Sequence, residues 1–234
     1  MKTIYEQTKL IAHRGFSDRY CENTYASFLN ACQKDFYGIE TDIQFTLDNK
    51  IVCFHDRTLK RLSGEKTKIS EIKYKDLKKK ELSVPKNRYT KHLICPFTLY
   101  LKLCKRHNKH CVIEIKGHPK EYQLEKLLKL TRKNKCLNNC IFISFNSSAL
   151  IYIRERHPHV KLQLLISQPL KRYTNFCIKN NIDVSFINKL VSKDLISKLN
   201  QKGINVSVWV VNNKDEAQKF INDGIEHITS NVFM

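Results

Sequence analysis

Short apolar runs alternate with amphipathic stretches along most of this chain. Eight of the runs have the length and composition of strands, and we expect them at residues 9–13, 37–42, 111–116, 140–145, 161–167, 182–187, 205–211 and 227–230. The stretches between them carry apolar residues at helical spacing, which predicts helices near residues 23–34, 122–133, 147–156, 194–201 and 215–222.

Strands that alternate with helices are typical of βαβ units and of a parallel sheet. Eight such units close into a (β/α)₈ TIM barrel, and 234 residues suit one lean domain of this kind over residues 1–234. An open doubly wound sheet is the alternative, but no Gly-rich nucleotide-binding turn follows the first strand. We therefore predict an α/β fold with a TIM barrel.

One segment interrupts the alternation of strands and helices with a predicted hairpin. Residues 42–46 and 51–55 alternate in polarity and flank a polar turn at residues 47–50. A four-residue turn closing Thr46 against Ile51 places Gln44 opposite Cys53 and Asp42 opposite His55. We therefore expect His55 to fold back beside Asp42.

Two further departures from a regular barrel are expected. Residues 57–95 are polar, rich in Lys and too long for an ordinary loop. They predict a small insertion with one helix near residues 70–79, which partly caps the site. After the last predicted strand, at 227–230, the sequence has no room for an outer helix. We expect the last outer helix to be missing, with this side of the barrel either thinner or covered by the N-terminal residues or by a second copy.

Composition narrows the cellular setting. The 42 Lys and Arg against 22 Asp and Glu give a net charge of +20, which attracts polyanions. A solvated Lys-rich surface is the favoured interpretation, because the charges lack the aromatic interleaving typical of nucleic-acid binding. No specific nucleic acid is expected, while peripheral contact with an anionic membrane stays open. Nine Cys, an odd number without a CxxC pair, favour a reducing, cytoplasmic setting.

Three carboxylates fall at the ends of predicted strands. Glu40 and Asp42 are two residues apart and therefore share one face of their strand, the barrel interior. Side by side they would repel each other, and Glu114, at the end of the next barrel strand, adds a third. This oxygen-rich set predicts one divalent cation, Mg²⁺ or Ca²⁺. Salt bridges to Arg or Lys are the alternative without a metal.

Four more ionisable residues lie at the same predicted rim. His13 ends the first strand and His55 ends the hairpin, so the pair can divide acid and base roles. Metal ligation by one His is the competing functional interpretation. Arg14 and Lys116 can hold a phosphate, because Arg offers two parallel donors and Lys a point charge. Neutralising the carboxylates is their alternative role, and the two roles are compatible.

Two residues are candidates for a substrate wall. Trp209, the one Trp in the chain, ends the seventh predicted barrel strand, where it packs in the core or contacts a glycerol or alkyl group. Glu22 precedes Asn23 and Thr24, one of which we expect to cap the first helix. Glu22 itself can face the site.

Taken together, the motifs resemble the glycerophosphodiester phosphodiesterase family. They are HRG at 13–15, ENT at 22–24, GIETDIQFTLDNKIVCFHD at 38–56, IEIK at 113–116, ISF at 143–145 and VWVVN at 208–212. The family is a (β/α)₈ barrel with an insertion after its His-Asp pair. The end of the chain departs from the family pattern, which usually has Thr-Asp or Thr-Asn followed by Pro where this chain reads Thr229-Ser230-Asn231.

The resemblance implies a role for each motif residue. Glu40, Asp42 and Glu114 would bind the metal, and His13 and His55 would be general base and acid. Arg14 and Lys116 would bind the phosphate of a glycerophosphodiester, which the family hydrolyses to glycerol 3-phosphate and an alcohol. Some relatives act on lysophospholipids or on polymers that resemble teichoic acid.

Two alternative functions stay open. The first is a lysophospholipase D that docks on anionic membranes through its basic surface, with lysophospholipid as substrate. The second is a catalytically idle barrel that binds polyanions, which the presence of both His and all three carboxylates disfavours. The alcohol headgroup and the oligomeric state are not predicted by the motifs.

Overall fold

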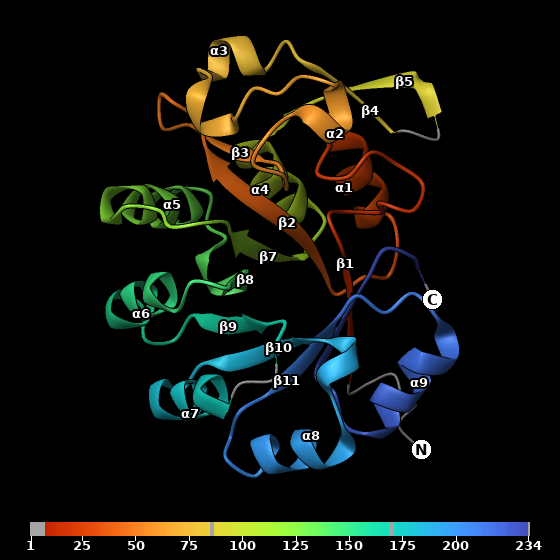
Figure 1. Cartoon of the computed structure of the whole chain (residues 1–234), viewed down its shortest axis with the longest axis vertical. Helices are drawn as coiled ribbons and strands as arrows, with labels where there is room; N and C mark the ends of the chain where they lie inside the picture. The colour runs from red at the N-terminus through yellow and green to blue at the C-terminus, as the bar shows by residue number, and fades with distance from the viewer. Residues whose placement is uncertain (1–7, 85–86, 169–170, 234) are drawn as a thin grey trace.

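Each of the eight predicted runs forms a strand, and the strands close into a barrel (Figure 1). The computed structural model describes residues 8–84, 87–168 and 171–233. Among these residues, parallel pairing follows the order β1-β12-β11-β10-β9-β8-β7-β2, and β2 returns to β1. The barrel strands are β1 (Lys9–Ala12), β2 (Gly38–Phe45), β7 (His110–Ile115), β8 (Cys140–Ser144), β9 (Lys161–Ile166), β10 (Asp183–Ile187), β11 (Val206–Trp209) and β12 (His227–Ser230). The predicted TIM barrel is confirmed.

Helices lie on the outside of the barrel between successive strands (Figure 1). All five predicted helices are present. Two further outer helices, α4 (Phe97–Arg106) and α7 (Lys171–Asn180), were not predicted from the sequence. The outer helices are α1 (Tyr25–Cys32), α4 (Phe97–Arg106), α5 (Glu121–Lys133), α6 (Ser147–Arg156), α7 (Lys171–Asn180), α8 (Lys193–Asn200) and α9 (Lys214–Asn222). Two short 3₁₀ helices, η3 (Leu137–Asn139) and η4 (Asn188–Leu190), complete the connections.

Alternation of side chains along the strands produces two apolar layers. The larger one lies between strands and helices and includes Ile39, Phe142 and Leu164. A smaller cluster lies inside the barrel and is formed by Ile11, Val112, Ile141, Ile143 and Leu165. The interior is therefore packed below the rim, so polar residues at the carboxyl-terminal ends of the strands form a pocket with a closed floor.

The hairpin between β2 and β3 (Ile51–Cys53) is present, but its predicted register is wrong by one residue. Ile43, and not Gln44, pairs with Cys53. The turn holds three residues, because Thr46 N donates to Lys50 O at 2.9 Å, and Asn49 takes a left-handed conformation with φ of 56°. Consequently the residue opposite Asp42 is Phe54, whose amide donates to Asp42 O, and His55 lies one residue further on.

The insertion at residues 57–95 is more structured than the single helix predicted for residues 70–79. It contains α2 (Lys60–Ser63), the 3₁₀ helix η2 (Ile69–Glu71), α3 (Tyr74–Leu77) and the strands β4 (Glu81–Val84), β5 (Asn87–Leu93) and β6 (Cys95–Pro96). Leu59, Leu62 and Ile69 belong to a separate apolar cluster beneath it. The cluster also contains Val52 and Phe54, so the insertion packs on the hairpin through an apolar core separate from that of the barrel. Figure 1 shows the insertion gathered at one end of the molecule, remote from α8.

Within the described residues no helix follows β12. Instead, the Phe233 ring packs edge-on against Phe36, with 5.2 Å between ring centroids. A cavity of about 440 Å³ lies beside it, between β1 and α9, with Leu10, Tyr37 and Ile221 among its lining residues. No eighth outer helix covers this cavity within the described residues, and the predicted alternative, cover by the N-terminal residues, concerns residues 1–7, which lie outside them.

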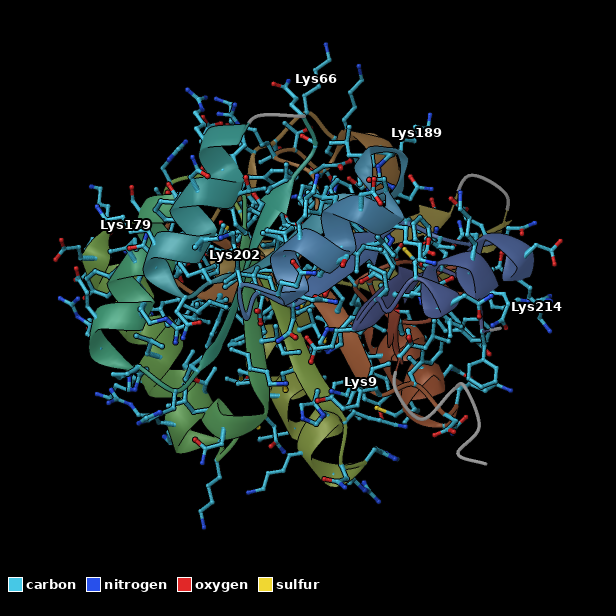
Figure 2. All side chains as sticks on the ribbon, turned by 90° about the horizontal axis from the view of Figure 1, so that it is seen from below. Lys9, Lys66, Lys179, Lys189, Lys202 and Lys214 are labelled. Carbon is cyan, nitrogen blue, oxygen red and sulfur yellow. The ribbon has the colours of Figure 1, made fainter. Side chains whose placement is uncertain are left out.

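Basic side chains surround the molecule. Figure 2 shows labelled Lys side chains on elements as far apart in the chain as β1, α7 and α9, so the charge of +20 is not confined to one element. All nine Cys are buried, each as a free thiol. No helix in the described part of the chain is both long and apolar enough to cross a bilayer.

Candidate active site

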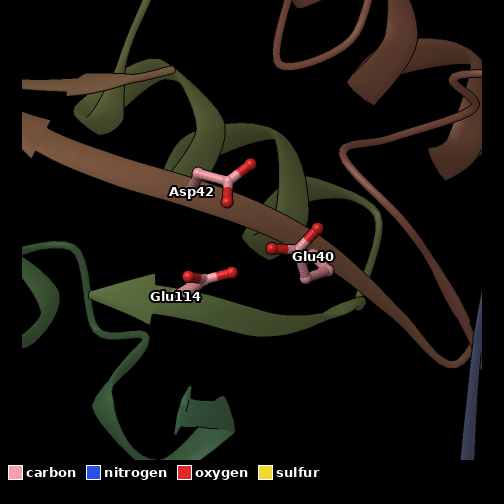
Figure 3. Close-up of side chains that lie close together, drawn as sticks. All are labelled: Glu40, Asp42 and Glu114. Atoms are coloured by element: carbon pink, nitrogen blue, oxygen red, sulfur yellow. The ribbon is translucent and has the colours of Figure 1, made fainter. Parts of the chain in front are cut away.

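Three carboxylates converge at the carboxyl-terminal ends of β2 and β7. Glu40 and Asp42 lie two residues apart on β2, so their side chains point to the same face of the strand, as their spacing predicts. Asp42 pairs in register with Glu114 on β7, which brings the third carboxylate beside the other two. Figure 3 shows the three groups facing one space, and one oxygen of each residue lies within 4.8 Å of the others.

Burial makes this cluster electrostatically uneven. Burial, together with the charges of Asp42 and Glu114, raises the pKa of Glu40 well above its usual range. Burial and the charge of Asp42 likewise raise the pKa of Glu114 to about 7. Burial opposes ionisation of Asp42 too, but Arg14 and Lys116 outweigh it and hold the Asp42 pKa at about 2. The protein therefore stabilises one ionised carboxylate of the three, and a cation would stabilise the others.

The donor set fits a hard divalent ion. Carboxylate oxygens are the ligands that Mg²⁺ and Ca²⁺ prefer in proteins. Asp42 Oδ1 is buried and accepts no hydrogen bond from any residue that the structure describes, which leaves it available to an ion. The part of the chain that the structure describes thus contains a candidate metal centre formed by Glu40, Asp42 and Glu114.

Two basic side chains flank the carboxylates. Arg14 Nε lies 3.2 Å from Asp42 Oδ2, and Lys116 Nζ lies 2.7 Å from Glu114 Oε1 and 3.3 Å from Asp42 Oδ1. Both therefore neutralise the cluster, the alternative role that the sequence left open. Both also line the pocket above it, where a phosphate would meet them.

The HRG motif forms a tight turn directly after β1. Arg14 and Gly15 both have left-handed backbone conformations, with φ of 54° and 78°. The turn aims the Arg14 amide at Glu40, where it donates to Oε2 at 2.8 Å. A Cβ at Gly15 would lie 2.6 Å from Ser27 Oγ, so glycine is required there on steric as well as conformational grounds.

Asn23 supports the site directly, a role that the sequence analysis missed. The helix cap belongs to Thr24, whose side chain accepts from Ser27 N. The Asn23 amide is buried and reaches Asp42 instead: its Nδ2 donates to Asp42 Oδ2 at 2.8 Å. Its Oδ1 accepts from the Thr41 hydroxyl at 2.8 Å and from Asp42 N at 3.2 Å. Asn23 thereby fixes Asp42 Oδ2, while Oδ1 faces Lys116 Nζ at 3.3 Å.

The two predicted His line the same pocket but have different partners. His13 Nδ1 lies 2.7 Å from Asn231 Oδ1, an acceptor, so Nδ1 carries the proton and Nε2 is free to accept one. Burial and the charge of Arg14 lower the His13 pKa to about 4, which keeps this ring neutral. His55 Nδ1 lies 2.6 Å from Asp56 Oδ1, a carboxylate.

The pocket has a volume of about 220 Å³, with a charged side and an apolar side. The charged side consists of His13, Arg14, Glu40, His55, Glu114 and Lys116, so six of the seven residues predicted to bind or react are lining residues. Asp42, the seventh, lies beneath them. The apolar side is formed by Ile143, Phe145, Leu165 and Trp209.

The two candidate wall residues have different positions. Trp209 lines the pocket, its indole Nε1 donates to Ser185 O at 3.1 Å, and the half-exposed Phe145 ring packs edge-on against it. Glu22 is not a lining residue: it accepts hydrogen bonds from Arg14 and from Arg61 of the insertion. None of the insertion's described residues lines this pocket.

Fold and site together define the class of this protein as an enzyme with a TIM barrel whose rim suits a phosphodiester. Residues 13–232 match the model of the Glycerophosphoryl diester phosphodiesterase family, and the chain belongs to this family. The match confirms the family and the enzyme class that the motifs predicted, a phosphoric diester hydrolase.

Individual relatives agree along nearly their whole length. YhdW of Bacillus subtilis is 28% identical over 232 residues, which cover 94% of this chain and 93% of that protein. A glycerophosphodiester phosphodiesterase of Caldanaerobacter subterraneus is 27% identical, over 95% and 93% of the two chains. Among solved structures, an Oleispira antarctica phosphodiesterase in complex with its product sn-glycerol-3-phosphate has the same fold, with a TM-score of 0.87 at 20% identity over 97% of this chain and 95% of that one.

Proposed function

We propose that this enzyme hydrolyses small glycerophosphodiesters to sn-glycerol 3-phosphate and an alcohol, with a divalent cation held by Glu40, Asp42 and Glu114. The observation that carries the proposal is the carboxylate trio, buried Glu40 and Asp42 with half-buried Glu114, in a pocket that two His and two basic residues line. When bound, Mg²⁺ or Ca²⁺ supplies Lewis-acid polarisation of the phosphate and of an attacking or leaving oxygen.

Charge balance supports a phosphodiester as the substrate. With all three carboxylates ionised, as a bound cation would keep them, the charges of Arg14 and Lys116 leave one net negative charge on the protein groups of the cluster. A divalent ion changes this to one net positive charge, which matches the single negative charge of a phosphodiester. Arg14 and Lys116 then orient the phosphate and stabilise the charge that develops on its oxygens.

The partners of the two His support different roles. We infer that His13, neutral and with Nε2 free, removes a proton from the nucleophile. His55, paired with the Asp56 carboxylate, protonates the leaving alcohol. Water and the substrate's own neighbouring glycerol hydroxyl both suit this arrangement as nucleophiles, the second through a cyclic phosphate.

Turnover of glycerophosphocholine and glycerophosphoethanolamine tests the proposal, assayed with Mg²⁺, with Ca²⁺ and with chelator. We expect activity that chelator abolishes and metal restores, and a loss of about a hundredfold or more in kcat for His13→Ala and for His55→Ala. Glu114→Gln should abolish activity, whereas Glu121→Gln, an exposed carboxylate at the start of α5, should not. Full turnover in excess chelator would contradict the proposed metal dependence. Inactivity on every diester would contradict the proposed hydrolysis of glycerophosphodiesters.

A second candidate is a lysophospholipase D that works at anionic membrane surfaces. The apolar side of the pocket offers Phe145 and Trp209 to an acyl chain. The insertion carries thirteen Lys and Arg against four Asp and Glu over residues 57–95, a density that suits anionic headgroups. Cytoplasmic location with peripheral membrane contact is the corresponding cellular setting.

The KM values of a Trp209 variant for the two kinds of substrate separate the two candidate functions. If an acyl chain packs against Trp209, Trp209→Ala should raise the KM for a lysophospholipid about tenfold. The KM for glycerophosphocholine should stay within about threefold of the wild-type value. Binding to vesicles with anionic lipid, lost at high salt, would support the membrane setting. Equal effects of Trp209→Ala on both substrates would favour the glycerophosphodiesterase alone.

A further inference from the structure

One residue of the insertion reaches the active site through two carboxylates. Arg61, on α2, donates from Nε to Asp56 Oδ2 at 2.7 Å and from Nη2 to Asp56 Oδ1 at 3.2 Å. The same guanidinium donates to both oxygens of Glu22, at 2.7 and 2.8 Å. Its donors thus hold two carboxylates at once, a geometry that only the planar fork of Arg provides.

Both carboxylates touch residues of the proposed catalytic machinery. Asp56 Oδ1 lies 2.6 Å from His55 Nδ1, and Glu22 Oε1 accepts from Arg14 Nη1 at 2.9 Å. Arg14 in turn lies against Asp42. A continuous chain of ion pairs therefore runs from His55 through Arg61 to the phosphate-binding guanidinium and the candidate metal centre.

The position of Arg61 indicates that its role is not packing. Its side chain is 41% exposed, so its removal opens no cavity in the core. The neighbours Leu59 and Leu62 are buried in the cluster beneath the insertion and anchor α2 independently of it. Burial opposes ionisation of Asp56 and Glu22, but their hydrogen bonds and ion pairs, those from Arg61 prominent among them, keep the pKa of both groups below its usual value.

We propose that Arg61 is a positioning residue of the active site, through which the insertion holds Asp56 against His55 and Glu22 against Arg14. The inference rests on the proposed function for its catalytic consequence. With Arg61 present, Asp56 stays hydrogen-bonded to the Nδ1–H of His55, which leaves Nε2–H to protonate the leaving alcohol. Glu22 at the same time limits Arg14 to one orientation.

Turnover of Arg61→Ala tests this role, with Lys60→Ala as control. Lys60 is exposed, lies on the same helix and carries the same charge. We expect Arg61→Ala to lower kcat about 10–100-fold with KM within about threefold, because misplaced catalytic groups slow the chemical step. Lys60→Ala should match the wild type in both constants, and thermal unfolding of both variants should coincide.

Two further variants separate positioning from charge. Arg61→Lys keeps the charge but cannot bind both carboxylates, so it should recover little of the lost kcat. Because the site of Arg61 is open to solvent, low concentrations of guanidinium should restore activity to Arg61→Ala, whereas sodium at equal ionic strength should not. A kcat of Arg61→Ala within about twofold of the wild type would overturn the inference. So would full recovery by Arg61→Lys, or a loss that guanidinium leaves unchanged.

A spectrum tests the same contact without turnover. Long-range ¹H–¹⁵N spectra of the imidazoles, assigned for His55 by its loss in His55→Ala, report which ring nitrogen carries the proton. We expect Nδ1 of His55 to carry a proton in the wild type and to lack it in part of the Arg61→Ala molecules. An identical His55 pattern in the two proteins would overturn the role of Arg61. Inactivity of the wild type would instead refute the proposed function, and the spectrum would still decide the inference.

Discussion

Asn23 Nδ2 lies 2.8 Å from Asp42 Oδ2, and this contact between two buried side chains holds the central carboxylate of the site. The Asn23 amide also accepts from Asp42 N, so it grips the backbone and the side chain of the same residue. Asp42 in turn is the carboxylate that Arg14 and Lys116 keep ionised. The orientation of the candidate metal ligands therefore depends on a residue outside the pocket.

Asn23→Ala should reduce stability and metal affinity together. The substitution leaves buried polar groups of Thr41 and Asp42 without their partner, and it places Ala at a left-handed φ of 56°. We expect the free energy of unfolding to fall by about 2–3 kcal/mol and metal affinity to fall about 10–100-fold. Urea unfolding and metal titration measure the two effects. Asn30→Ala, on α1, is the control, and equal behaviour of the two variants would contradict a supporting role for Asn23.

Glu40→Gln should have opposite effects on the metal-free and metal-bound protein. Burial and two neighbouring carboxylates raise the Glu40 pKa, so its ionised form costs stability when no cation is present. In chelator we expect the melting temperature of Glu40→Gln to lie about 2–4 °C above that of the wild type, the shift that about 1 kcal/mol produces in a domain of this size. Added Mg²⁺ or Ca²⁺ should then stabilise the wild type and not the variant. Stabilisation of both by metal would place the ion elsewhere.

Gly15→Ala tests the tight turn of the HRG motif. The new Cβ would lie 2.6 Å from Ser27 Oγ and 2.7 Å from the Ser27 carbonyl carbon. The second atom belongs to the backbone, whose displacement costs more free energy than a side-chain rotation. Gly64→Ala is a matched control, because Gly64 has a similar φ of 81° but nothing within 4 Å of an added Cβ. We expect Gly15→Ala to lose at least about 2 kcal/mol more than Gly64→Ala by urea unfolding. Equal losses would mean that the backbone conformation alone matters there.

Local patterns predicted the barrel because strand and helix periods are properties of short segments. The eight runs and the Glu-x-Asp spacing needed no knowledge of distant residues, and both are present as predicted. The hairpin register needed the conformation of Asn49, whose left-handed φ shortens the turn to three residues and shifts His55 by one position. Composition does not reveal which Asn adopts that conformation.

The supports of the site could not be predicted, because they connect segments far apart in the chain. Arg61 contacts Glu22, which lies 39 residues before it, and nothing in the spacing of either residue indicates the other. Either Asn23 or Thr24 was expected to cap α1, and Thr24 does so, but nothing in the sequence indicated the buried contact of Asn23 with Asp42. The seven ionisable candidates were found since strand ends in a barrel meet at one rim.

His227 should make the fold sensitive to acid independently of the active site. It begins β12, is fully buried, and has a ring Nε2 with no hydrogen-bond partner among the described residues. Burial lowers its pKa to about 4; Glu226 opposes this shift, while Lys9, Lys161 and His110 reinforce it. In the unfolded chain His227 binds a proton near pH 6.5, whereas in the folded protein it does so only near pH 4. The free energy of unfolding therefore falls as pH drops from 6.5 to about 4.

His227→Gln removes this proton site and should flatten the acid dependence. His13 keeps its own share of the loss, because its pKa is also lowered to about 4. Between neutral pH and about pH 4.5, we expect the variant to lose about 1–3 kcal/mol less stability than the wild type. Urea unfolding at both pH values measures the difference, with exposed His159→Gln as the control. If His227→Gln and the wild type lose the same stability, the unfolded and folded chains bind protons at residue 227 equally, and burial of this ring is not the cause of acid sensitivity.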